Sequence, residues 1–308
     1  MSYLHHDAGA RELGVLRVAV FGVWLVLIWQ LPVSNLALLP RELIDPPGLA
    51  GLLPLEAVFS SATAMGWLKA ATLVGCAACI AGARPFRPIA LATWILIWLV
   101  DASMKSIGGF VNHAQLGPLY VAFIVALSPA AEGLRMRLSR RPDSLDAVMG
   151  TGSAWRFVVP LQASALVLAT AYAFMGIRRL VRGGVGIYLD GSLDLWLVAR
   201  SLQHSAYPFD LGLLALRSAT FSMVVALGFA VATLFEATSP LALRFAAYRF
   251  AWLLIIGGLH VMTLLTMNIF FWENLVLILV LFTGLPTLIA RRAPLATSDD
   301  RERSRVVE

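Results

Sequence analysis

Charged residues are scarce in this chain. Asp, Glu, Lys and Arg make up 14% of its 308 residues, whereas a typical soluble domain carries about 25%. The net charge of +6 does not indicate nucleic-acid binding, because the basic residues cluster in short loops and form no compact basic face. The composition therefore excludes an ordinary soluble domain, and we expect no nucleic-acid partner.

Cysteine is also scarce, and motifs for metal or phosphate are absent from the sequence. The only two cysteines, Cys76 and Cys79, form a C-x-x-C pair within a stretch of small apolar residues. A lone pair in that setting favours close helix packing over redox chemistry or metal binding. The sequence contains no H-E-x-x-H motif, no cluster of two histidines with a carboxylate, and no Gly-rich phosphate loop. We predict no metal site.

Long apolar segments are what the sequence has in abundance, with 59% hydrophobic residues and a mean hydropathy of +0.79. Segments near membrane length predict an all-α polytopic membrane protein with about eight transmembrane helices, whose partner is the lipid bilayer. They lie at about 15–31, 57–82, 88–104, 114–131, 157–176, 218–237, 250–267 and 270–290. A single domain over residues 1–292 is expected, followed by a charged, disordered cytoplasmic tail over residues 293–308.

The distribution of Lys and Arg predicts the orientation of these helices. With the more basic loops inside, both termini are cytoplasmic and the loop 177–217 lies outside. That loop contradicts the trend, because it carries Arg178, Arg179, Arg182, Arg200 and Arg217. An arginine does not give up its proton at physiological pH, so Arg178 and Arg179 are candidates for binding an anion or anchoring a helix.

A polar stretch separates the third and fourth segments. Asp101, Lys105, Asn112 and His113 lie close together there, at or near membrane depth. Polar groups at that depth usually face a cavity or one another, which makes them candidates for a site. A structural alternative is a hairpin in which Asp101 pairs with Lys105 at a spacing of four and His113 caps a helix.

Three further polar residues interrupt the later spans. His260 and Asn268 lie eight residues apart, on nearly one face of a helix, and are expected to point into the bundle. A buried structural histidine is the alternative for His260. Glu236 lies at the predicted inner end of the sixth segment, where we expect it to pair with Arg244 or Arg249.

The order of these residues resembles a known family. Four motifs carry the resemblance: Asp101 followed by Asn112-His113, Tyr172…Gly176-Ile-Arg-Arg-Leu180, Leu234-Phe-Glu236…Pro240, and His260-Val-Met…Met267-Asn268…Phe270. Together they are similar to the HTTM family, the membrane domain shared by vitamin K-dependent gamma-glutamyl carboxylase and many bacterial relatives. The resemblance extends from about Arg11 to Arg292 and implies a multi-pass protein of a bacterial plasma membrane.

The resemblance also implies roles for several residues. Arg179 occupies the position of the lysine that serves as the carboxylase's base, with Arg178 beside it. His113 matches a histidine thought to orient the oxygen chemistry, and His260 matches a histidine in a later span. A general base needs a pKa near the working pH, and arginine resists that shift, so vitamin K-dependent carboxylation itself is not expected. Another proton acceptor, such as Lys105 or His113, would be needed.

The sequence thus predicts a membrane-embedded enzyme with an outward-facing pocket for a quinone-like or peptide substrate. The catalytic candidates are His113, Arg179, Lys105 and His260, and the substrate-binding candidates are Arg178, Asn112, Asp101 and Asn268. The cofactor stays unknown, since reduced vitamin K or another quinone is implied only by the resemblance. The alternative is a non-catalytic accessory protein in the maturation, export or immunity of a secreted peptide.

Overall fold

The computed structural model describes residues 9–106, 115–130, 155–202 and 207–292. Across these ranges the regular elements are all helical, and the chain is an all-α polytopic membrane protein, as predicted. Six helices in the described part are long and apolar enough to cross a membrane. They are α1 (Ala10–Gln30), α3 (Ala62–Ala81), α4 (Phe86–Lys105), α6 (Trp155–Gly183), α8 (Ala219–Ala237) and α10 (Ala246–Met267).

Two shorter apolar helices and several connecting helices complete the described chain. The shorter apolar pair is α5 (Leu116–Leu127) and α11 (Trp272–Phe282). The other α-helices are α2 (Glu56–Phe59), α7 (Ser192–Ser201), α9 (Leu241–Arg244) and α12 (Leu285–Arg292). Short 3-10 helices lie in the loops: η1 (Val33–Leu38), η2 (Arg41–Leu43), η3 (Gly48–Leu52), η7 (Gly186–Tyr188) and η8 (Leu211–Leu216).

Local sequence signals define several helix ends. Ser61 and Ser218 cap α3 and α8, each accepting a hydrogen bond from the backbone N–H three residues later. Helix α3 ends at Gly82, whose φ is +72°, a left-handed conformation that glycine adopts without strain. Helix α10 ends in the same way at Asn268, with φ +56°.

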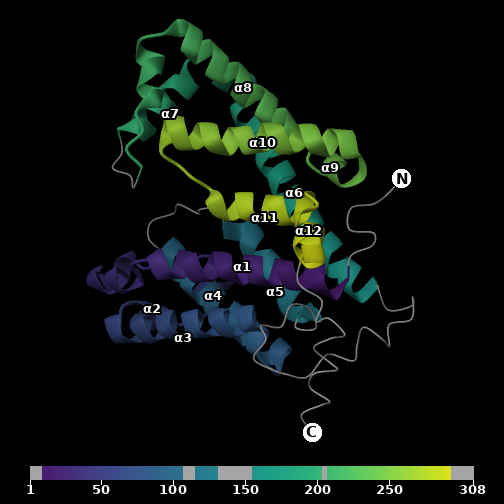
Figure 1. Cartoon of the computed structure of the whole chain (residues 1–308). Helices are drawn as coiled ribbons and strands as arrows, with labels where there is room; N and C mark the ends of the chain where they lie inside the picture. The colour runs from purple at the N-terminus through teal and green to yellow at the C-terminus, as the bar shows by residue number, and fades with distance from the viewer. Residues whose placement is uncertain (1–8, 107–114, 131–154, 203–206, 293–308) are drawn as a thin grey trace.

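The helices form two packed groups that α6 joins. Figure 1 shows α1, α3 and α4 in one group and α8 with α10 in the other, while α6 and α11 lie between them. The first part of α6 belongs to the larger core, to which Phe157, Leu161 and Leu168 contribute. A smaller core packs α7 and α8 against α10. The end of α6 crosses the second group and carries its polar side chains there.

The structure refines three of the predicted segments. The segment 57–82 is two helices, α2 and α3, and the segment 270–290 is likewise divided into α11 and α12. Helix α6 continues seven residues beyond the predicted end at 176, so Arg178 and Arg179 are helical rather than part of a loop. The predicted disordered tail, 293–308, lies outside the described residues.

A buried arginine links three helices of the larger group. Arg17, in the middle of α1, is fully buried. Its guanidinium donates to the carbonyl oxygen of Ile80 in the last turn of α3 at 3.2 Å, and to that of Ala130, just beyond α5, at 2.8 Å. Carbonyls at helix ends have no partner within the helix, so Arg17 satisfies groups that apolar surroundings would leave unpaired.

Candidate functional site

A cavity of about 420 Å³ lies where α6, α8 and α10 meet, with α5, α7 and α11 contributing to its walls. Its volume is within the range of small-molecule sites, about 300–1,000 Å³. Most of the wall is apolar. The polar lining residues are Tyr172, Arg179, Arg200, Glu236, His260, Thr263 and Asn274.

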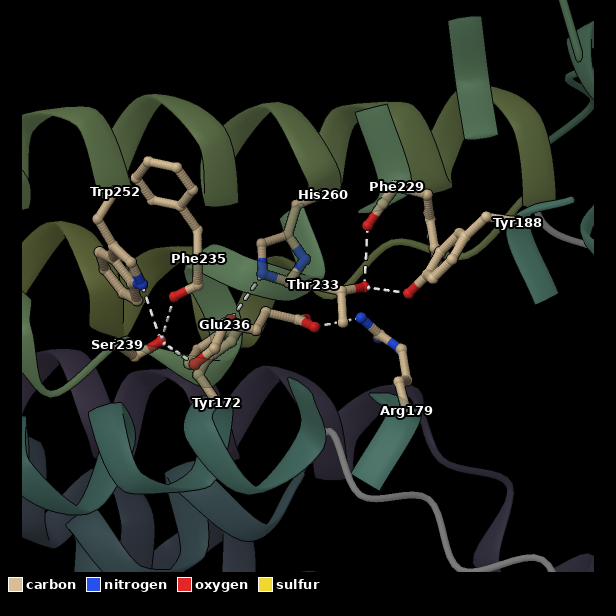
Figure 2. A network of polar contacts seen from close by, with 10 residues as sticks. All are labelled: Tyr172, Arg179, Tyr188, Phe229, Thr233, Phe235, Glu236, Ser239, Trp252 and His260. Atoms are coloured by element: carbon tan, nitrogen blue, oxygen red, sulfur yellow. Dashed lines mark hydrogen bonds and ion pairs between the residues drawn. The ribbon is translucent and has the colours of Figure 1, made fainter. Parts of the chain in front are cut away.

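An ion pair links α6 to α8 at this cavity. Arg179 donates through Nη1 to Oε2 of Glu236, and Figure 2 shows the two side chains pointing toward each other. The Glu236 side chain is 3% exposed and that of Arg179 is 28% exposed. The guanidinium also lies 5.0 Å from the ring centre of Phe229, close enough for a cation–π contact. Arg179 is therefore a bound cation, and the pair is neutral as a unit.

This ion pair corrects two predictions. Glu236 does not take Arg244 or Arg249 as its partner: Arg244 lies over the ring of Phe245 and Arg249 donates to the carbonyl of Ala242. The orientation derived from the basic loops had also placed Arg179 on the outer side and Glu236 at the inner end of its span. The two side chains are in contact, so they lie at the same depth in the membrane. The prediction that they lie on opposite sides is wrong.

A close helix crossing brings the pair together. Gly176 lies one turn before Arg179, and a Cβ atom there would come within 2.4 Å of the backbone nitrogen of Ala237 and 2.8 Å of the carbonyl oxygen of Thr233. Only glycine allows α6 to approach the α8 backbone so closely. The short distance lets Arg179 reach Glu236, which precedes Ala237 in α8.

A tyrosine and a histidine form the second polar pair of the cavity. A 2.6 Å hydrogen bond joins Tyr172 Oη in α6 to His260 Nε2 in α10 (Figure 2), and both side chains are buried. The imidazole also meets the ring of Phe271 edge-on, with the ring centres 5.7 Å apart. Its other nitrogen, Nδ1, has no hydrogen-bond partner among the described residues. Such a pair can pass a proton through the hydrogen bond that joins it.

A hydrogen-bonded chain supports this arrangement from behind. The Trp252 indole donates to Ser239 Oγ at 2.8 Å, and Ser239 Oγ lies 2.7 Å from the carbonyl oxygen of Glu236, to which it donates. Trp252 also packs edge-on against Tyr172, with ring centres 5.7 Å apart. Ser239 and Trp252 thus hold the α8 backbone at Glu236 and the ring of Tyr172 in one assembly.

The predicted site residues divide into three groups. Arg179 and His260 line the cavity, whereas Arg178 does not. Asp101 and Lys105 form a buried ion pair within α4 at 2.5 Å, as the structural alternative predicted, and they are not part of the cavity wall. The other three candidates are Asn268, Asn112 and His113.

Asn268 has a structural role at the end of α10, where its side chain binds the backbone of a neighbouring loop. Its side chain accepts from the N–H of Phe209 at 3.0 Å and donates to the carbonyl of Phe209 at 2.7 Å, which fastens the chain before η8 to α10. It does not line the cavity. Asn112 and His113 lie outside the described residues.

Tyr172 and Glu236 are the cavity residues whose roles the sequence did not reveal. Both occur in motifs that carry the family resemblance, but Tyr172 was not singled out and Glu236 was assigned a different partner. A carboxylate inside an apolar span was the available signal, because such groups normally mark a site or an ion pair. Asn274, near the start of α11, is likewise a polar residue within an apolar segment, and it also lines the cavity.

The structure offers no metal centre within the described ranges, where no group of three or more His, Cys, Asp or Glu side chains could hold an ion. Cys76 and Cys79 are free and fully buried. Cys79 Sγ lies 3.6 Å from Thr93 Oγ1 of α4, consistent with a packing role.

Comparisons with protein-family models, curated protein sequences and solved structures gave no match.

Proposed function

We propose that this chain is a membrane-embedded enzyme of the HTTM type that binds a quinone-like molecule in the cavity and exchanges a proton with it through Tyr172 and His260. The observation that carries the proposal is the convergence of two polar pairs, Tyr172–His260 and Arg179–Glu236, on one cavity between apolar helices. Ionisable groups in such surroundings are costly and are typically functional.

The lining suits a flat molecule with oxygen atoms at both ends of an apolar ring. Tyr172 with His260 offers one polar contact, and Arg179 with Glu236 offers another. The wall also includes Leu168, among other apolar side chains. A quinone or hydroquinone ring has this distribution of polar and apolar surface.

Proton exchange would begin at Tyr172. Its hydroxyl group touches the substrate oxygen, and His260 on its other side replaces or accepts the proton that moves. Arg179 does not act as the base, because it keeps its proton and is paired with Glu236. Its remaining N–H groups are suited to hold a substrate oxygen.

The family resemblance supports the same assignment. Tyr172 and Arg179 belong to one of its motifs, Glu236 to a second and His260 to a third, and all four side chains line this cavity. The match to the carboxylase's base position is with Arg179, so we propose the family's membrane site without its carboxylation reaction.

The test compares two Tyr→Phe variants in lipid nanodiscs. Tyr172→Phe removes the hydroxyl at the cavity, while the control Tyr248→Phe removes one that only meets Thr238 on the exposed surface. We expect the wild type to bind 2-methyl-1,4-naphthoquinone, measured by calorimetry, and Tyr172→Phe to weaken binding about 5- to 10-fold, the value of one hydrogen bond. The reaction measured is oxidation of the hydroquinone by O2, in which the ring gives up two electrons and two protons and O2 becomes hydrogen peroxide. Its rate should fall about 100-fold or more in Tyr172→Phe, because the hydroxyl that relays the first proton is lost.

Two results would contradict the proposal. If the wild type does not bind the quinone, a quinone is not the substrate. Binding without any turnover would leave a non-catalytic binding protein, in line with an accessory role. The Tyr248→Phe control should match the wild type in both measurements.

A further inference from the structure

A buried carboxylate lies beside the cavity without lining it. Glu273, in the first turn of α11, is 5% exposed. Its carboxylate meets its own backbone N–H, and it forms no ion pair or hydrogen bond with any other residue in the described ranges. A carboxylate buried without a partner is costly unless it takes up a proton. Glu273 is therefore a group that can hold a proton inside the protein.

The other buried charged side chains of the described chain have partners. Arg17 donates to backbone carbonyls, Asp101 pairs with Lys105, and Glu236 pairs with Arg179. Glu273 differs from all of these, and packing does not explain an acid at its position. A glutamine would fill the same space without the cost of burying a charge.

The turn that carries Glu273 forms part of the cavity wall. Phe271 and Asn274, on either side of it in the sequence, both line the cavity. The Phe271 ring also meets the imidazole of His260 edge-on, with ring centres 5.7 Å apart. Glu273 itself interacts electrostatically with Tyr172. Glu273 therefore lies beside the Tyr172–His260 pair, behind the cavity wall.

Few charged groups on the described helices face this turn. Helix α11 packs against α1, α5, α6, α10 and α12. Helix α5 has no charged residue, the charged residues of α1 end at Arg17, and the arginines of α12 lie at its C-terminal end. The titratable groups that share the cavity with α11 are Tyr172 and Arg179 of α6, Arg200 of α7, Glu236 of α8 and His260 of α10. Arginines keep their protons and Glu236 is bound to Arg179, so the Tyr172–His260 pair is the group with which Glu273 can exchange a proton.

We propose that Glu273 holds the proton that the Tyr172–His260 pair removes from the substrate. This assignment rests on the proposed function and adds the place to which the proton goes. Glu273 acts through the pair and does not touch the substrate.

The first proton of hydroquinone oxidation has to be held while O2 reacts. One substrate hydroxyl gives its proton to Tyr172 while Tyr172 passes its own to Nε2 of His260, and Nδ1 of His260 releases a proton to the Glu273 carboxylate. The hydroquinone anion then gives two electrons and its second proton to O2, which becomes the hydroperoxide anion. Glu273 returns the first proton, which completes hydrogen peroxide and restores the carboxylate.

The experiment replaces the acid by an amide of the same size. Glu273→Gln cannot take up a proton, Glu273→Asp can, and Glu42→Gln, on an exposed carboxylate, is the matched control. Each full-length variant in lipid nanodiscs is compared for the Kd of 2-methyl-1,4-naphthoquinone, for the rate of hydroquinone oxidation by O2, and by infrared spectroscopy. Thermal melting confirms that each variant folds.

The expected loss is in rate rather than in binding. Glu273→Gln lowers the oxidation rate about tenfold or more, because the pair then has no acceptor for its proton. It changes the Kd of the quinone by no more than about twofold. Glu273→Asp, or acetate added to Glu273→Gln, restores much of the rate, since each supplies a carboxylate again. Glu42→Gln matches the wild type.

The infrared spectrum reports the proton on Glu273 independently of activity. Between about pH 9 and about pH 6, carboxyl groups in water stay ionised. Acidification over that range should produce a carboxylic-acid C=O band in the wild type and in Glu42→Gln, and Glu273→Gln should remove this band.

Other results overturn the assignment in distinguishable ways. If the wild type oxidises the hydroquinone and Glu273→Gln does so at the same rate, Glu273 does not hold the proton, while the proposed function stands. If the rate falls but neither Glu273→Asp nor acetate restores it, and no infrared band is lost, Glu273 has only a structural role. If the wild type neither binds nor oxidises the probe, the proposed function fails and the assignment with it.

Discussion

At the scale of single residues, the two adjacent arginines Arg178 and Arg179 differ in their surroundings. Arg179 neutralises Glu236, which is almost fully buried, and stacks on Phe229. Arg178 lies next to it in α6 but outside the cavity wall. Removing one partner of a buried ion pair leaves an uncompensated charge, which costs more than replacing both partners.

This difference gives a double-mutant prediction. Arg179→Gln should destabilise the protein by about 2 kcal/mol, below the ~3–5 kcal/mol of fully buried pairs because Arg179 is partly exposed. Adding Glu236→Gln should restore much of the loss, since two neutral amides then face each other. Thermal melting in detergent measures both, with Arg41→Gln, on an exposed arginine, as the control. Equal melting of the single and double variants would contradict a buried ion pair.

At the scale of helices, the crossing of α6 over α8 depends on Gly176. A methyl group at that position would overlap the α8 backbone, which cannot move without disturbing Glu236. We expect Gly176→Ala to destabilise the protein by about 1–3 kcal/mol through overpacking and to weaken quinone binding.

The matched control for this change is Gly66→Ala in α3, where a Cβ meets open space. There the better helix propensity of alanine should stabilise the protein slightly, by up to about 1 kcal/mol. The two identical substitutions should therefore shift the melting temperature in opposite directions. A shift of the same sign in both would show that Gly176 is not a point of close contact.

Helix positions were largely predictable from the sequence, but the site was only partly so. Apolar length located a helix in each of the eight predicted segments, because a span must satisfy its own backbone hydrogen bonds, but only six of these helices are long enough to cross a membrane in the part of the chain that the structure describes. The end of α6 was missed, since Arg178 and Arg179 look like a loop until Glu236 is known to neutralise one of them. That partner lies 57 residues away, and no local pattern specifies it. The Tyr172–His260 contact, 88 residues apart, was hidden for the same reason.

At the scale of the whole molecule, Arg17 connects elements that are distant in sequence. Two of its hydrogen bonds reach 63 and 113 residues along the chain, to the last turn of α3 and to Ala130 just beyond α5. Both contacts come from one planar guanidinium, a geometry that an ammonium group does not reproduce.

We therefore expect Arg17→Lys to lose at least one of these hydrogen bonds. The cost of an unsatisfied buried carbonyl, about 1–3 kcal/mol, should appear as a lower melting temperature. Hydrogen exchange should also become faster near the end of α3. Arg41→Lys, on an exposed arginine, serves as the control, and an unchanged melting temperature for Arg17→Lys would contradict the role given to Arg17.

The distance in sequence between Arg179 and Glu236 also has a consequence for biosynthesis. Ribosomes add about 5–20 residues per second, so Arg179 is made roughly 3–11 s before its carboxylate partner. During that interval an unpaired guanidinium cannot settle in the hydrocarbon layer without a large cost. The end of α6 must therefore wait at the membrane surface, or beside the insertion machinery, until α8 arrives. The cavity is in this sense a late product of assembly, closed only after the second group of helices is inserted.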